Sequence, residues 1–179
     1  MVIIIPSNMN GALRNIYLIG MMGVGKSTIG RILANYLKWA FIDVNEMLEA
    51  IYSRPLQEII ATFGEESLRT MEATMLQELS QGEHQVFACN SDTVLEESKF
   101  QTMDTTGATI WLDTPVADLV ERMESKEMII EGGGDPGNIL QEMLDDRKKY
   151  YQRANVRVAT DNLTPEVTAK EILKVLKSL

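Results

Sequence analysis

One short segment of the chain, GMMGVGKS at residues 20–27, follows the pattern G-x-x-x-x-G-K-[ST] in full. An apolar run at residues 16–19 comes before this segment, and apolar side chains at helical spacing continue over residues 27–37. Glycines in such a loop let successive backbone N–H groups turn toward one anion, and the following helix directs its positive end at the same point. The segment therefore predicts a strand, a phosphate-binding loop and a helix, with a nucleoside triphosphate as ligand.

The two polar side chains at the end of this loop have different tasks. Lys26 provides a positive charge for the outer phosphates, and the Ser27 hydroxyl is a ligand for Mg²⁺. A chance match on a tight turn between a strand and a helix is the alternative interpretation. The patterns on either side favour the phosphate loop, because the motif has this meaning only between a strand and a helix.

The rest of the chain alternates short apolar runs with longer amphipathic patterns. Further strands are predicted at residues 40–42, 86–89, 109–112 and 156–159. Further helices are predicted at residues 45–53, 55–63, 65–80, 92–101, 115–123, 137–152 and 165–177. This order predicts an α/β fold with three layers, α/β/α, on a five-stranded parallel sheet, and ligands beyond the carboxyl ends of its strands.

No internal repeat or low-complexity linker divides the chain, so we expect a single domain over residues 1–179. A polar segment at about residues 124–138 carries three consecutive glycines. We interpret this segment as a lid that becomes ordered when ligand is bound.

The charge balance excludes some classes of partner. The chain has 17 Lys and Arg against 26 Asp and Glu, a formal net charge of −9, so its surface as a whole attracts neither nucleic acid nor an anionic membrane. The single cysteine allows no intrachain disulfide. No apolar stretch reaches the roughly 18 to 20 residues of a membrane span, and the run at residues 2–5 is too short for a signal-peptide core. We expect a cytoplasmic protein.

Four segments together resemble the shikimate kinase family: GMMGVGKSTIGRILA, FIDVNEMLE, EIIATFGEESLRTME and DRKKYYQRANVRVATDN. The resemblance covers roughly residues 14–176, and its G-E-x-x-L-R-x-x-E part is more specific than the phosphate loop. It implies a P-loop kinase fold like that of nucleoside monophosphate kinases. It also implies transfer of the γ-phosphate of ATP to a ring hydroxyl of shikimate, with Mg²⁺, under a closing lid.

For the nucleotide half of the site, the resemblance implies a complete set of residues. The phosphates and the metal would be bound by Gly20, Gly23, Val24, Gly25, Lys26, Ser27 and Thr28. Asp43 matches the first acid of the family's D-x-D and would support the metal through water. Arg122 and Pro165 fall where the family lines the two sides of the adenine.

For the acceptor half, the resemblance implies binding of a small, hydroxylated, anionic metabolite. Arg69 and Glu72 match the family's F-R-x-x-E, with Leu68 in place of the phenylalanine. Arg147 matches the arginine of R-x-P-L-Y, and the two arginines would clamp the shikimate carboxylate. Asn45 stands at the second acid of D-x-D, also against the acceptor. The resemblance implies catalytic roles for Lys26, Asp43 and Arg69.

The chain departs from the family at three places around the acceptor. Asn45 replaces a carboxylate that can orient or deprotonate a substrate hydroxyl, and general-base help is typically worth about 10² to 10⁴ in rate. Residues 89–91, Cys-Asn-Ser, replace a glycine triplet, which should change the space for the substrate ring. Ile129 stands near the position of the lid arginine, and Lys126 could substitute only as a point charge.

Several of these residues have a structural alternative. Asp43 could cap the next helix, and Arg69 could pair with Glu65 one turn earlier. Glu72 could hold an arginine without touching substrate.

The same is true of three residues in the second half of the chain. Arg122 lies on an ordinary amphipathic helix, and Arg147 lies in a basic cluster, so both could be solvated. Asp92 lies just past a strand, and it is either a second acid near the metal or a helix N-cap.

Three functions remain open from the sequence. The first is an active shikimate kinase with unusual acceptor contacts, and the second is a related kinase for another hydroxylated, anionic metabolite. The third is a nucleotide-binding protein without kinase activity that serves as a regulator or partner. In each case we expect ATP and Mg²⁺ as ligands and a monomer as the assembly.

Overall fold

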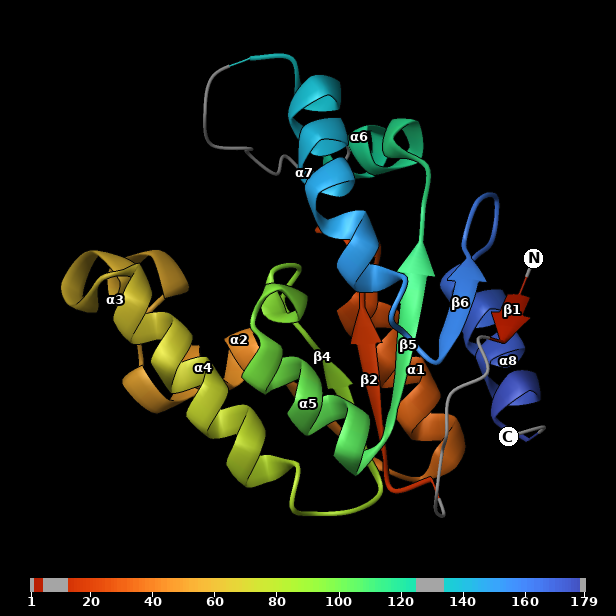
Figure 1. Cartoon of the computed structure of the whole chain (residues 1–179), viewed down its shortest axis with the longest axis horizontal. Helices are drawn as coiled ribbons and strands as arrows, with labels where there is room; N and C mark the ends of the chain where they lie inside the picture. Colours follow the sequence, from red (N-terminus) through yellow and green to blue (C-terminus); the bar gives the residue numbers. More distant parts are fainter. Residues whose placement is uncertain (1, 5–12, 125–133, 178–179) are drawn as a thin grey trace.

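The computed structural model describes residues 2–4, 13–124 and 134–177, and it shows a central sheet with helices on both faces (Figure 1). The strands are β1 (Val2–Ile4), β2 (Asn15–Ile19), β3 (Ala40–Asp43), β4 (Gln85–Ala88), β5 (Ala108–Asp113) and β6 (Val156–Ala159). The helices are α1 (Lys26–Leu37), α2 (Val44–Tyr52), α3 (Leu56–Phe63), α4 (Glu65–Leu79), the 3₁₀ turn η1 (Thr93–Leu95), α5 (Glu97–Thr106), α6 (Val116–Glu124), α7 (Pro136–Tyr151) and α8 (Pro165–Leu176). The predicted α/β class is confirmed.

The sheet has the strand order β1-β6-β5-β2-β4-β3. The strands β2 to β6 are parallel, as predicted, and β2 lies between β4 and β5. The short strand β1 adds an antiparallel edge, with Val2 opposite Val158 of β6. This sixth strand was not predicted, although its apolar run is as long as that of the strand predicted at residues 40–42.

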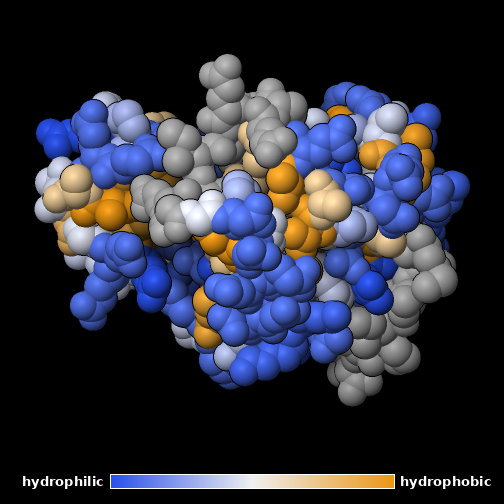
Figure 2. Space-filling model, turned by 90° about the horizontal axis from the view of Figure 1, so that it is seen from above, coloured by the Kyte–Doolittle hydropathy of each residue, from blue (hydrophilic) through white to orange (hydrophobic). Residues whose placement is uncertain are grey.

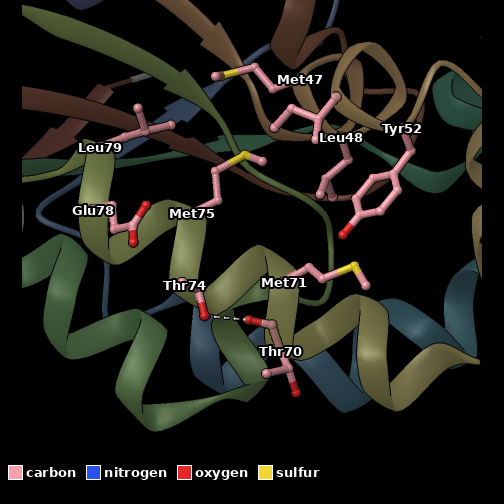
Figure 3. Close-up of a pocket in the computed structure, with 10 residues that line it drawn as sticks. Met47, Leu48, Tyr52, Thr70, Met71, Thr74, Met75, Glu78 and Leu79 are labelled. Atoms are coloured by element: carbon pink, nitrogen blue, oxygen red, sulfur yellow. Dashed lines mark hydrogen bonds between the residues drawn. The ribbon is translucent and has the colours of Figure 1, made fainter. Parts of the chain in front are cut away.

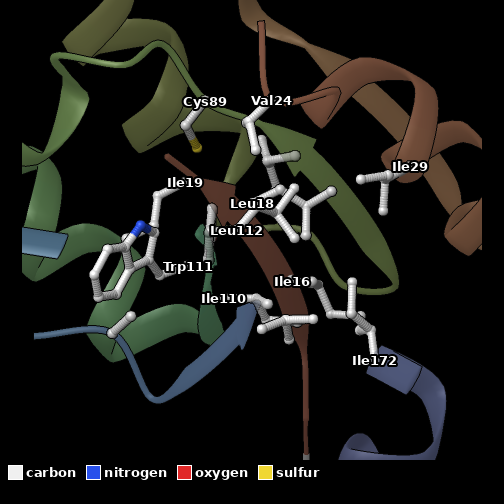
Figure 4. Packing of buried hydrophobic residues seen from close by; sticks show 14 of the residues in the cluster. Ile16, Leu18, Ile19, Val24, Ile29, Cys89, Ile110, Trp111, Leu112 and Ile172 are labelled. Carbon is white, nitrogen blue, oxygen red and sulfur yellow. The ribbon is translucent and has the colours of Figure 1, made fainter. Parts of the chain in front are cut away.

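Alternation along the strands sends side chains to two helical layers. Leu18 of β2 faces α1 so closely that a Cβ added to Gly30 would lie 3.3 Å from Leu18 Cδ1. Its neighbour Tyr17 faces the other layer, where its hydroxyl bonds Ser80 after α4 and Thr106 at the end of α5. Figure 4 shows buried side chains of this core on both sides of β2. The strand β2 is therefore buried on both faces, which explains its nearly continuous apolar sequence.

The predicted helices are confirmed within one residue at each end, except for the one predicted at residues 92–101. Here the chain forms η1 and then an extended residue, Glu96, with φ −98° and ψ 115°. The α-helix begins only at Glu97 and continues to Thr106. The predicted start at Asp92 is wrong, because the extended residue separates the 3₁₀ turn from α5.

The helices α2, α3 and α4 form a group at one end of the molecule, on the left of Figure 1. They share a second hydrophobic cluster, in which the buried residues are Val44, Leu48, Ile59 and Leu68. This cluster fixes α4 beside the carboxyl ends of β3 and β4. The side chains of Arg69 and Glu72 on α4 consequently lie next to the phosphate loop, in a cavity described below.

The predicted lid at about residues 124–138 falls mostly outside the described residues, and so do Lys126, Ile129 and the first two glycines of its triplet. The described chain resumes at Gly134, and α7 begins after Asp135. The Asp135 side chain accepts a hydrogen bond of 3.0 Å from the backbone N–H of Asn138 and thereby caps this helix.

Hydrophilic residues cover most of the face shown in Figure 2, as the formal net charge of −9 leads one to expect. Within the described part of the chain, no helix is long and apolar enough to cross a membrane.

Candidate active site

The loop at residues 20–25 joins the end of β2 to the start of α1, as the sequence predicts. Gly23 and Gly25 have φ angles of 76° and 96°, which residues with a side chain rarely adopt. Gly20 has a φ of 141°, and a Cβ at this position would lie 2.6 Å from the carbonyl oxygen of Leu112. The three glycines are therefore required by the backbone. The loop leads directly into the first turn of α1, whose N–H groups have no partner within the helix.

Lys26 and Ser27 begin α1, and each is held in place by hydrogen bonds. Lys26 Nζ donates to the carbonyl oxygens of Gly20 and Met21, both at 2.9 Å. Ser27 Oγ donates to Asp43 Oδ2 at 2.6 Å. A hydroxyl and a carboxylate at this distance are the oxygen ligands that Mg²⁺ prefers.

Asp43 joins this pair to the next helix. Its other carboxylate oxygen, Oδ1, accepts from the backbone N–H groups of Asn45 at 3.1 Å and Glu46 at 3.3 Å, at the start of α2. Both interpretations of Asp43 are therefore compatible, because one oxygen caps a helix while the other faces Ser27.

Burial lowers the pKa of Lys26 to about 8, and the nearby carboxylates of Asp43 and Asp92 oppose that shift only in part. The charged form of Lys26 is thus costly until an anion accompanies it. Bound phosphate should raise this pKa again, so above pH 8 nucleotide binding must be coupled to the uptake of a proton.

We expect this proton uptake to be measurable by calorimetry of MgADP binding at pH 8.5 in two buffers of different ionisation enthalpy. The apparent binding enthalpy should differ between the buffers at pH 8.5, and much less at pH 7, where Lys26 is already charged. The affinity should fall as the pH rises through about 8. The variant Lys26→Arg should lose the buffer dependence, and an equal enthalpy in both buffers for the wild type would contradict the assignment.

One cavity of about 650 Å³ lies beyond the carboxyl ends of β3 and β4. It brings together eight of the predicted site residues, namely Gly23, Lys26, Ser27, Asp43, Asn45, Arg69, Glu72 and Arg147. It also contains Asn90, Ser91 and Asp92 from the segment after β4. The two halves of the predicted site thus share one space.

Arg122 and Pro165 line a smaller cavity of about 150 Å³ on the other side of the loop, together with Val24, Gly25 and Thr28. Gly23 lines both cavities, so the two spaces meet at the phosphate loop. The Arg122 guanidinium donates to the carbonyl oxygens of Val24 at 3.3 Å and Thr160 at 3.4 Å. Arg122 is therefore held against the loop and is not a solvated helix residue.

Arg69 points into the edge of the large cavity but remains mostly exposed. Its Nη2 lies 3.8 Å from Glu65 Oε2, one turn earlier on α4, and 57% of its side chain is accessible. Such an exposed pair contributes little to stability and is easily exchanged for another anion. The alternative interpretation of Arg69 thus describes its state without ligand.

Glu72 is buried, and it does not hold an arginine. Lys99 Nζ of α5 donates to Glu72 Oε2 at 3.1 Å, and the Asn90 amide donates to Glu72 Oε1. Lys99 also lies 2.9 Å from Glu96. Lys99 was not predicted, because a single lysine in an amphipathic helix normally faces solvent. Here its side chain is only 3% exposed, and it forms a buried ion pair beneath the cavity.

We expect Lys99→Met to lower the free energy of unfolding at pH 7 by about 3–5 kcal/mol, because it leaves the Glu72 carboxylate buried without its cation. Burial already raises the pKa of Glu72, and Lys99 opposes that rise. Without Lys99 the pKa should rise further. The destabilisation should then shrink as the pH falls, because a neutral Glu72 carries no such cost. Urea unfolding at pH 7 and pH 5 measures both effects.

A matched control is Lys174→Met on α8, where the ion pair with Glu171 leaves 71% of the lysine side chain exposed. This change should cost at most about 1 kcal/mol. An equal loss of unfolding free energy in the two variants would show that the buried ion pair stabilises the fold no more than an exposed one.

Ser91, in the segment after β4, accepts hydrogen bonds from two residues of α7. Arg147 Nη1 of α7 donates to Ser91 Oγ at 2.9 Å, and the Tyr151 hydroxyl donates to the Ser91 carbonyl oxygen at 2.6 Å. Burial raises the pKa of the Cys89 thiol to about 12, so Cys89 is a neutral packing group. Arg147 is half-buried at the cavity, where the bond to Ser91 directs its guanidinium.

Two further polar residues face the same space. Asp92 makes no side-chain capping bond to η1, so the cap interpretation has no support, and its carboxylate lies in the cavity with Lys26. Asn45 also lines the cavity, but its Oδ1 is buried without a hydrogen-bond partner. The Asn45 amide group thus presents its NH₂ side to the open space.

A separate groove of about 390 Å³ between α2 and α4 is lined mainly by apolar side chains (Figure 3). Met47, Met71 and Met75 surround it, and Glu78 is its only charged residue among those described. It contains no cation for a phosphate, and we do not assign the candidate site to it.

The fold and the cavity define a class of protein: a P-loop phosphotransferase of small molecules, with the phosphate loop and an acceptor space on one edge of a parallel sheet. Comparison with known proteins identifies the family. The sequence model described as shikimate kinase matches residues 22–177. The chain belongs to the shikimate kinase family, and it is accordingly an ATP-dependent phosphotransferase with an alcohol group as acceptor.

Individual relatives agree with this family. Shikimate kinase from Synechococcus elongatus is 31% identical over 168 residues, covering 92% of this chain and 87% of that protein. Shikimate kinase from Gloeobacter violaceus is 35% identical over 164 residues, covering 90% and 92%. Among solved structures, shikimate kinase from Acinetobacter baumannii in complex with shikimate has a TM-score of 0.86 at 28% identity, covering 93% of this chain and 94% of that chain.

Proposed function

We propose that this chain transfers the γ-phosphate of ATP, with Mg²⁺, to a hydroxyl of shikimate or of a related anionic, hydroxylated metabolite. The observation that carries the proposal is the single cavity in which Lys26 and Ser27 share space with Arg69 and Arg147. A phosphate donor and an anionic acceptor would each find cations there. The solved relative with bound shikimate supports the choice of acceptor.

On the donor side, Lys26 would bind the outer phosphates and Ser27 with Asp43 would hold the metal. Among the described residues, no group of three or more His, Cys, Asp or Glu side chains could hold a metal by itself. Mg²⁺ usually takes one or two carboxylates and completes its shell with phosphates and water. When bound, the ion would neutralise charge that develops on the phosphates. Arg122 and Pro165 would line the adenine in the smaller cavity.

On the acceptor side, Arg147 and Arg69 would bind the carboxylate. Arg147 is already directed by Ser91, and a carboxylate is a stronger partner for a guanidinium than a hydroxyl. Arg69 is free to leave Glu65 because that pair is exposed. Phosphoryl transfer depends mostly on positioning and charge, so the residues' main contribution is to hold the acceptor hydroxyl in line with the γ-phosphate.

A second candidate is a nucleotide-binding protein that has lost kinase activity and acts as a regulator or partner. Asn45 favours it, because an uncharged amide, unlike the carboxylate of the family's pattern, cannot take a proton from the acceptor hydroxyl. The bonds of Asn90 to Glu72 and of Arg147 to Ser91 also show that polar groups of the acceptor half have partners within the protein.

We also propose that residues 1–179 form one domain that acts as a monomer in the cytoplasm, with the segment at about residues 124–138 as its lid. The neutral, buried Cys89 and the acidic composition are compatible with such a location.

The deciding experiment mixes the protein with MgATP and shikimate and follows ADP release. A panel of other hydroxylated carboxylates, such as quinate and gluconate, is tested in parallel. Turnover that depends on an acceptor supports the kinase. Calorimetric binding of MgATP without turnover on any acceptor supports the second candidate, and failure to bind MgATP would refute both.

A further inference from the structure

The amide of Asn90 is held in one orientation. Its Nδ2 donates to Glu72 Oε1, and a carboxylate can only accept, so the NH₂ side of the amide must face Glu72. An inverted amide would place two acceptor oxygens against each other. The carbonyl oxygen, Oδ1, therefore lies on the side away from Glu72.

Asn90 Oδ1 is available to a ligand. No described residue donates a hydrogen bond to it, and it is not among the buried side-chain atoms that lack a partner. An oxygen that is neither bonded nor buried must be accessible. Because Asn90 lines the large cavity beside Ser91, that oxygen faces the acceptor space.

The Glu72 carboxylate, which orients Asn90, is itself held by an ion pair. Lys99 Nζ binds Glu72 Oε2 at 3.1 Å, and Glu96 approaches Lys99 at 2.9 Å. Both oxygens of Glu72 thus have partners within the protein, and its side chain is only 7% exposed. The role in acceptor binding that the resemblance implies for Glu72 stays a prediction.

We propose that Asn90 is a specificity-determining residue, whose carbonyl oxygen accepts a hydrogen bond from a hydroxyl of the acceptor, and that Lys99 is a positioning residue that acts on it through Glu72. The inference rests on the proposed function, because the acceptor must enter this cavity. The neighbouring Ser91 binds Arg147, so the same cavity is lined by an amide oxygen, which can accept from a hydroxyl, and by a guanidinium. This pair fits a ligand that carries both a hydroxyl and a carboxylate.

Calorimetry with the full chain and MgADP tests the proposal, using shikimate and its three monodeoxy analogues as probes. The variant Asn90→Ala should bind shikimate roughly tenfold more weakly than the wild type, the usual order for one lost hydrogen bond. One deoxy analogue, which lacks the contacted hydroxyl, should bind wild type and variant equally. MgADP affinity should not change.

Two further variants separate positioning from simple stability. Lys99→Met should reduce the preference for shikimate over the same deoxy analogue, and Lys99→Arg should preserve it, because arginine still supplies the charge. Asn35→Ala, on the exposed face of α1, is the control amide and should change neither ligand.

The calorimetric results that would overturn the proposal are distinct from those that support it. The proposal would be overturned if Asn90→Ala weakened the binding of shikimate and of all three analogues equally. It would also be overturned if this variant kept the wild-type preference for shikimate over every deoxy analogue. If Lys99→Met does not fold, the Asn90→Ala result decides alone. Wild-type protein that binds no shikimate also overturns it, whereas the ADP-release assay judges the proposed function separately.

Discussion

Replacing Lys26 with methionine is expected to slow ATP-dependent phosphorylation of the acceptor by about 10² to 10³-fold, the usual loss for one positioned group that stabilises transition-state charge. Methionine has a similar length and should preserve the packing of the loop. It cannot supply the positive charge that Lys26 brings to the phosphates, nor the hydrogen bonds to Gly20 and Met21. ADP release at saturating acceptor measures the loss.

Lys170→Met on α8 is the matched control, because it removes an exposed lysine that lines neither cavity. Its rate should equal that of the wild type, and melting curves should show that both variants are folded. A Lys26→Met enzyme that keeps more than a tenth of the wild-type rate would contradict the role assigned to this residue.

The donor half of the site could be predicted because its determinants are local. The motif at residues 20–27 lies between a strand and a helix. Each of its glycines has a positive φ angle that the backbone of this loop requires. Asp43 is sixteen positions away from Ser27, yet both follow parallel strands whose carboxyl ends meet at one edge. The family resemblance assigns Asp43 to this site, and the topology explains its contact with Ser27.

The support of the acceptor half could not be predicted, because its contacts join distant segments. Lys99 meets Glu72 across 27 positions, and Arg147 meets Ser91 across 56. A lysine on an amphipathic helix gives no signal that its charge is buried. The packing of α5 against α4 places Lys99 beneath the cavity. The spacing of apolar residues in the sequence does not indicate that these two helices pack together.

The segment at residues 89–91 affects both the space for the acceptor and the hydrogen bonds of the cavity wall. Its replacement of a glycine triplet predicts a smaller acceptor space. The structure adds that Asn90 and Ser91 make hydrogen bonds to Glu72 and Arg147, two residues of the cavity wall. Two of the departures from the family pattern, Asn90 and Ser91, are thus bonded to residues of the cavity wall, and their effect on the acceptor must be considered together with these hydrogen bonds.

Asn45→Asp is expected to raise the rate of acceptor phosphorylation by about 10²-fold, at the lower end of what a general base contributes. Asn45 lies in the first turn of α2, where its N–H donates to Asp43, and aspartate is well tolerated at the start of a helix. The new carboxylate would be partly buried near Asp43 and Asp92. Desolvation and like charge should raise its pKa above the usual range of aspartate, which suits a base that works near neutral pH.

The pH profile separates this gain from a change in binding. The variant should show a new loss of kcat on the acid side, where the introduced carboxylate becomes protonated, and MgADP affinity should stay that of the wild type. Asn35→Asp on α1 adds the same charge at an exposed position and should leave the rate unchanged. If Asn45→Asp is no faster than the wild type but binds shikimate equally well, proton abstraction does not limit this enzyme. The loss of the second acid would then have been tolerated because positioning and charge at Lys26 and Arg147 supply most of the catalysis.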